Sequence, residues 1–194
     1  MLLTAFLSLL VIRHLTQFID GLQREDRIKL VVFPIRVRAV HITVLWFAIM
    51  IGAALKLWLR PPPIDHIFIT GWGLLLAGIA LGMLAYMRLR PFFSQEPVIF
   101  KGAGLVRDGI YSIVRHPYRL GLILEMLGAI LVSRTWYSLL LWLGAIVGLL
   151  YRTRQEDQML RQYHGAAAAN YQTTVPAWNV AAGLIRLRKG NKGD

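Results

Sequence analysis

The 194-residue sequence contains no cysteine, and its charged residues are scarce. The absence of cysteine excludes disulfide bonds, thiolate metal sites and cysteine nucleophiles. Asp, Glu, Lys and Arg together make up 16% of the chain, whereas hydrophobic residues make up 56%. A composition this apolar is unlike that of an ordinary soluble domain and is typical of a membrane protein.

The patterns of several common kinds of site are missing as well. There are no convincing β-strands, and no glycine-rich phosphate loop follows a strand. His14, His41, His66 and His164 are scattered without the spacing of metal ligands. We therefore expect no metal site and no glycine-rich nucleotide fingerprint.

Acidic residues are also few, since 22 Lys and Arg stand against 10 Asp and Glu, a net charge of +12. The basic residues flank apolar segments and do not form the aromatic-interleaved groove of a nucleic-acid-binding protein. In a membrane protein such residues set the topology and meet anionic lipid headgroups. The expected partner is thus the lipid bilayer, and not nucleic acid.

What the sequence does contain is a series of long apolar stretches. A helix rises ~1.5 Å per residue, so ~20 apolar residues cross a hydrocarbon core of ~30 Å. We predict an all-α integral membrane protein that forms one membrane domain over residues 1–194, with about five transmembrane helices at 2–19, 40–59, 67–87, 120–133 and 136–151. The fourth stretch is short, which indicates that the last two form a tight helical hairpin that either just spans or re-enters. A charged helical tail follows.

The distribution of Lys and Arg predicts the orientation. Segments 20–39, 88–119 and 152–194 together carry eighteen of these residues, whereas 60–66 and the hairpin tip carry two. By the positive-inside rule the N-terminus lies outside, and the tail and both longer loops are cytoplasmic. The compact size favours a prokaryotic plasma membrane.

Two pairs of glycines are spaced for close helix packing. These pairs are Gly78 with Gly82 and Gly144 with Gly148. Small residues four apart allow helices to approach closely, and we favour packing within this chain over a dimer interface. The oligomeric state stays open.

The cytoplasmic loop contains the first candidate site, the stretch 104–121 (GLVRDGIYSIVRHPYRLG). Pro117 is suited to the first turn of a helix, where free N–H groups attract an anion. Arg115 and His116 beside it are able to hold a carboxylate or phosphate. The alternative is a basic collar that only meets the membrane surface.

The second candidate site follows the hairpin at 151–165 (YRTRQEDQMLRQYHG). Arg152 and Glu156 lie four residues apart and share a helix face, either as functional groups or as a weak surface pair. Glu125 lies inside an apolar segment, where an ionised carboxylate costs roughly 2.5 kcal/mol or more. It either lines a cofactor or substrate cavity or is paired structurally, for example with Arg119.

Together these stretches resemble the isoprenylcysteine carboxyl methyltransferase family over about 98–176. The matching residues are Gly104-Leu105-Val106, Gly109, Tyr111, Arg115-His116-Pro117, Gly121, Arg152, Glu156, Gly165, Tyr171 and Val175-Pro176. Asp157 replaces a second Glu of the family pattern. Arg119, Ala168 and Thr174 stand where the family has Tyr, Tyr and a basic residue.

The resemblance implies an enzyme that uses S-adenosylmethionine, which leaves as S-adenosylhomocysteine, to methylate the carboxylate of a prenylated cysteine. It places the cofactor and catalytic region at 95–176, and Arg152 and Glu156 toward the substrate as catalytic residues. The cofactor residues implied are Glu96, Ala103, Gly104, Leu105, Val106, Tyr111, Arg115, His116, Pro117, Tyr118 and Arg119.

Three other functions stay open. A phospholipid N-methyltransferase would act on an amine such as phosphatidylethanolamine and would need Glu156 or Glu125 as a proton acceptor. A sterol-reductase-like enzyme would use NADPH with a similar Arg-His-Pro turn. A small membrane scaffold or transporter subunit would use the charged segments for topology alone.

Overall fold

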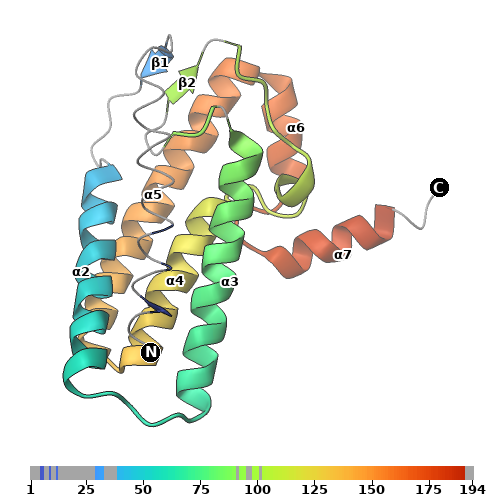
Figure 1. Cartoon of the computed structure of the whole chain (residues 1–194). Coiled ribbons are helices and arrows are strands. Elements are labelled where there is room, and N and C mark those ends of the chain that lie inside the picture. Colours follow the sequence, from blue (N-terminus) through green and yellow to red (C-terminus); the bar gives the residue numbers. More distant parts are fainter. Residues whose placement is uncertain are drawn as a thin grey trace.

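The structure, a computed structural model, describes residues 5, 6, 9, 12, 29–32, 39–90, 92–94, 98–100 and 102–190. Four long helices form the body of the molecule (Figure 1). They are α2 (Ala39–Leu59), α3 (His66–Leu89), α4 (Pro117–Ser133) and α5 (Leu139–His164). Two shorter helices, α6 (Ala166–Thr174) and α7 (Val180–Gly190), follow α5, and α7 projects from the side of the bundle (Figure 1).

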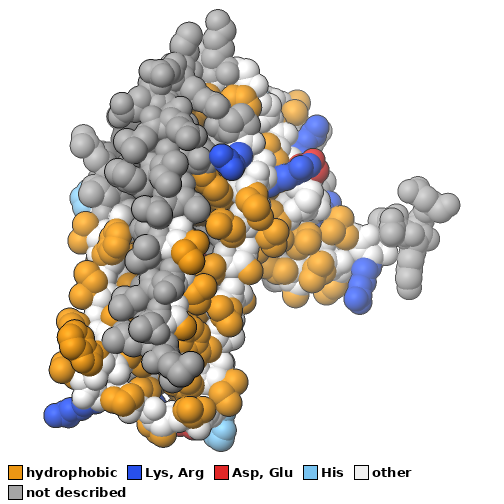
Figure 2. All heavy atoms as spheres, in the orientation of Figure 1, with side chains coloured by type: hydrophobic (Ala, Val, Ile, Leu, Met, Phe, Trp, Pro, Cys, Tyr) orange, Lys and Arg blue, Asp and Glu red, His pale blue; other side chains and the backbone are white. Residues whose placement is uncertain are grey.

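Three described segments are long and apolar enough to cross a membrane: His41–Leu59, His66–Leu89 and Trp136–His164. They confirm an all-α membrane protein. Hydrophobic side chains cover much of the described bundle surface in Figure 2, with Lys and Arg toward its two ends. The predicted span 120–133 lies within α4, whose 17 residues are fewer than in these three segments. The predicted span 2–19 falls largely outside the described residues.

Helices α3 and α4 pack at unusually close range because glycines face each other. A Cβ added to Gly78 would lie 2.6 Å from the carbonyl oxygen of Gly121, and one on Gly128 would lie 2.5 Å from the Leu75 nitrogen. The predicted role of Gly78 in packing within the chain is therefore confirmed. Gly144 differs, since a Cβ there would meet none of the described residues within 4 Å.

The tip of the α4–α5 hairpin and the loop between α2 and α3 lie at the same end of the bundle. Asp65 caps α3 by accepting a hydrogen bond from the Phe68 nitrogen at 3.0 Å. It also forms an ion pair with Arg134, which ends α4 in a left-handed conformation with φ 55°. The Phe68 amide and this guanidinium hold the pKa of Asp65 below its ordinary value. The predicted placement of both connections on one side is confirmed.

The structure corrects two predictions. Residues Lys29–Val32 (β1) and Val98–Phe100 (β2) form a short antiparallel pair, although no strand was expected. Strands of four and three residues are too short to stand out in a sequence pattern. Helix α5 also continues past residue 151, where the last predicted span ended, because the chain has no Gly or Pro between Tyr151 and His164 to interrupt it.

Glu125 on α4 is completely buried in the bundle core, among residues such as Ile49, Met126 and Leu149. Its Oε2 accepts a hydrogen bond from Nε1 of Trp46 on α2 at 3.2 Å. Arg119, the partner suggested from the sequence, contacts α5 instead. The Trp46 contact favours the structural alternative for Glu125.

Candidate active site

The site begins at the turn that leads into α4. Pro117 occupies the first turn of the helix, where its missing N–H leaves no hydrogen bond unmade. Backbone bonds tie this turn to the segment after α6: Arg115 N donates to Pro176 O at 3.0 Å, and His116 N donates to Ala177 O at 3.3 Å. The tail therefore holds the turn in place.

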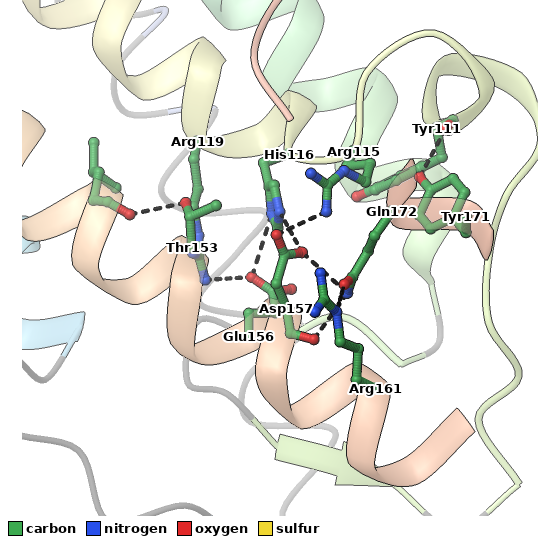
Figure 3. A network of polar contacts seen from close by, with 11 residues as sticks. Tyr111, Arg115, His116, Arg119, Thr153, Glu156, Asp157, Arg161, Tyr171 and Gln172 are labelled. Atoms are coloured by element: carbon green, nitrogen blue, oxygen red, sulfur yellow. Dashed lines mark hydrogen bonds and ion pairs between the residues drawn. The ribbon is translucent and has the colours of Figure 1, made fainter. Parts of the chain in front are cut away.

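Three basic side chains of this turn reach two acidic side chains on α5 (Figure 3). Arg115 Nη1 lies 2.7 Å from Asp157 Oδ2, and His116 Nε2 lies 3.0 Å from Asp157 Oδ1. Glu156 forms an ion pair with Arg119, and its Oε2 lies 3.6 Å from His116 Nδ1. Both ring nitrogens of His116 thus face a carboxylate.

Further side chains on α5 and α6 form hydrogen bonds to members of this network. Arg119 Nη1 donates to the Thr153 hydroxyl at 3.1 Å. Gln172 on α6 donates from Nε2 to the backbone oxygen of Asp157 at 2.8 Å, and its own Oε1 accepts from Arg161. The carboxylate-bearing turn of α5 is therefore fixed from two sides, by α4 and by α6.

Burial and charge set the protonation of the site. His116 is buried; burial alone would lower its pKa, but the hydrogen bonds with Asp157 and Glu156 outweigh this and raise it above the ordinary value. Burial raises the pKa of Tyr111 and of Tyr171, so both phenols stay neutral. The Tyr171 hydroxyl donates to the Tyr111 backbone oxygen at 2.7 Å.

Arg152 lies one helical turn before Glu156 on α5, and only 2% of its surface is exposed. A buried guanidinium favours an anionic partner, because its desolvation is otherwise costly. The basic side chains Arg115, His116, Arg119 and Arg152 outnumber the acidic Glu156 and Asp157, so this end of the bundle suits an anionic ligand.

A cavity of about 580 Å³ opens beside the end of α3. Its volume lies within the ~300–1,000 Å³ of small-molecule sites. Apolar and polar groups share its wall, which consists of Arg88, Leu89, Arg90, Phe92, Gly104, Leu105, Val106, Arg107 and Asp108. Arg88 and Asp108 form an exposed ion pair, with Arg88 Nε donating to Asp108 Oδ1 at 2.9 Å.

The predicted site residues divide into two groups in the structure. Gly104, Leu105 and Val106 line the cavity, whereas the predicted basic residues of the α4 turn contact α5. Tyr118 packs edge-on against Phe93, with ring centroids 4.8 Å apart. Two other predicted cofactor residues belong to neither group: Ala103 N donates to the Phe100 oxygen at 3.1 Å, and Pro117 is buried at the start of α4. Glu96 lies outside the described residues.

Several residues of the site were not singled out from the sequence. Asp157 was noted only as a substitution, yet it contacts both Arg115 and His116. Its position directly after Glu156 was the available signal. Arg88 and Asp108 are 20 residues apart and Gln172 is 15 residues from Asp157, so no local pattern could have joined them.

Comparison with known proteins gives a match to a family of enzymes. No curated protein matches the chain. Residues 71–162, which include most of α3, all of α4 and most of α5, match the isoprenylcysteine carboxyl methyltransferase (ICMT) family. The matched region contains the cavity, the Arg115–Arg119 turn and the acidic pair of α5. Over these residues the chain is thus similar to the isoprenylcysteine carboxyl methyltransferase family, and its long apolar helices fit an integral membrane protein.

Proposed function

We propose that the protein transfers a methyl group from S-adenosylmethionine to the carboxylate of a prenylated cysteine at the membrane surface. The observation that carries this proposal is the meeting of two distant segments. His116 and Arg119 contact Glu156 one helical turn after Arg152, at the polar end of a lipid-embedded bundle. A lipid-anchored anion reaches such a site from the side, with its apolar tail still in the bilayer.

The cavity beside α3 fits the cofactor. Leu105, Val106 and Phe92 offer an apolar surface for an adenine ring, and the arginines of the wall offer partners for a carboxylate. When bound, S-adenosylmethionine supplies a methyl group carried on a sulfonium. We assign Gly104–Val106 to contact with the cofactor. The turn that begins α4 would then connect the cofactor region with the substrate region on α5.

Arg152 is the proposed partner of the substrate carboxylate. A guanidinium presents two parallel N–H donors that match a carboxylate. Fixing the nucleophile in line with the methyl group and stripping its water lowers the barrier without proton transfer. A carboxylate attacks without losing a proton, so no general base is assigned.

Phospholipid N-methylation is the second candidate, and it would require a proton acceptor. Glu156, which the sequence suggested for this role, is already bound by Arg119 and His116. Cations at this distance favour the charged form of a carboxylate and make it a weak base. The geometry therefore favours a carboxylate acceptor over an amine.

The test uses purified protein in lipid with radiolabelled S-adenosylmethionine, farnesylcysteine and phosphatidylethanolamine. We expect base-labile methyl ester on farnesylcysteine. Stable label in the lipid alone would instead establish the amine reaction. Because Arg88, Arg90 and Arg107 would also suit phosphates, NADPH binding is measured in parallel. NADPH binding without methyl transfer would overturn the proposal.

A further inference from the structure

Helix α7 leaves the bundle sideways and has a composition unlike that of the other helices. Its eleven residues, Val180–Gly190, combine aliphatic side chains with Arg186, Arg188 and Lys189. In Figure 1 it runs at a steep angle to α3 and α4. A short helix that mixes apolar and basic residues in this way is typical of a membrane interface and not of a span.

The level of α7 along the bundle follows from the length of α4. One end of α4 is marked by the Arg134–Asp65 ion pair, and its 17 residues extend about 25 Å to Pro117. This length is close to the ~30 Å of a hydrocarbon core. The residues just before Pro117 therefore lie near the opposite membrane surface.

Helix α7 is held against those residues. A Cβ on Gly183 would lie only 1.9 Å from the carbonyl oxygen of Ile113, so this approach requires glycine. Arg186 donates to the backbone oxygen of Ser112. Together with the contacts of Pro176 and Ala177 to the α4 turn, these attachments keep α7 at the headgroup level and fix its rotation.

The outward side of α7 combines apolar exposure with positive charge. Leu184 and Leu187 lie three residues apart and share a face, with 46% and 38% of their surfaces exposed. Arg188 is exposed beside Leu184, and Lys189 is exposed farther around the helix. In Figure 2, hydrophobic side chains gather along the visible side of this arm, with a basic side chain near its end. No acidic side chain lies on α7.

We infer that α7 lies in the plane of the membrane surface and binds anionic phospholipid headgroups of the bilayer that surrounds the protein. The apolar face enters the boundary between headgroups and acyl chains, and Arg188 and Lys189 reach the phosphates. Lipid binding would then stabilise the segment that holds the α4 turn. The inference depends on the membrane location of the bundle and not on the methyl-transfer reaction.

Placement in the membrane is tested first, in the full-length protein. Because the chain lacks cysteine, Leu184→Cys and Ala182→Cys each provide one labelling site, on opposite sides of α7. Spin labels are attached in nanodiscs, and collision rates with oxygen and with a water-soluble nickel chelate are compared. We expect oxygen to dominate at position 184 and nickel at position 182. Equal nickel access at both positions would overturn the in-plane placement.

Recognition of charge is tested with an environment-sensitive fluorophore at position 184. We expect a larger blue shift in phosphatidylcholine nanodiscs that contain phosphatidylglycerol than in phosphatidylcholine alone, and loss of the difference at high salt. Arg188→Gln/Lys189→Gln should abolish the difference, whereas Lys56→Gln/Arg60→Gln at the far end of the bundle should retain it. The same emission in both lipids, or an unchanged difference in the α7 variant, would overturn the proposal.

Discussion

Nε2 of His116 lies 3.0 Å from Oδ1 of Asp157, a residue 41 positions later in the chain. This contact joins the first turn of α4 to the polar half of α5, and Arg115 contacts the same carboxylate. The two segments that carry the family motif are therefore connected through Asp157, which stands where the family pattern has a second Glu.

The raised pKa of His116 predicts a pH-dependent stability. The imidazolium bound by Asp157 and Glu156 stabilises the fold fully below the unfolded pKa of ~6.5. As pH rises from there through the higher pKa of the folded state, this stabilisation is lost. We expect Tm to fall over that window, measured by thermal unfolding in one detergent. His116→Asn should remove the slope, whereas His66→Asn at an exposed position should keep it.

Replacement of Arg152 should affect turnover more than cofactor binding. Loss of the substrate-orienting guanidinium in Arg152→Ala should lower turnover by about 100-fold, and Arg152→Lys should restore part of it. Arg154→Ala, on the exposed side of the same helix, is the matched control. Turnover and cofactor affinity are measured separately; equal loss of both would move Arg152 into the cofactor site.

The close contact between α3 and α4 predicts sensitivity to a single methyl group. Gly78→Ala would place Cβ 2.6 Å from the Gly121 oxygen and should cost about 1–3 kcal/mol of unfolding free energy. Gly73→Ala, on the same helix with no described atom within 4 Å, should be neutral or slightly stabilising. Reversible unfolding in mixed micelles measures both variants. Equal changes in unfolding free energy for the two variants would show that the close contact of Gly78 with Gly121 does not determine the cost.

The buried pair of Trp46 and Glu125 should be energetically coupled. Glu125→Gln retains an acceptor oxygen for the indole N–H, whereas Glu125→Leu does not, so the Leu variant should lose more stability. In a double-mutant cycle with Trp46→Phe, we expect a coupling of about 0.6–1.7 kcal/mol between the wild-type pair. Zero coupling would mean that the 3.2 Å contact contributes nothing to stability.

The sequence was sufficient for the features that depend on local pattern. Hydropathy located α2 and α3 to within a few residues, because a lipid-embedded helix needs a continuous apolar stretch. The Pro117 helix start also followed from local chemistry. By contrast, the contacts of Gln172 with Asp157 and of Arg88 with Asp108 depend on how distant segments pack. The pairing of Arg119 with Glu156 instead of Glu125 is a choice between carboxylates that spacing does not distinguish.

The continuity of α5 gives the bilayer a mechanical influence on the site. Its 26 residues form one rod about 39 Å long, with apolar side chains at one end and Arg152, Glu156 and Asp157 toward the other. A helix adapts to a thinner bilayer by tilting. Because α5 is unbroken, a tilt of its apolar half would also move its polar half. Membrane thickness would thereby change the distance between the carboxylates of α5 and the α4 turn.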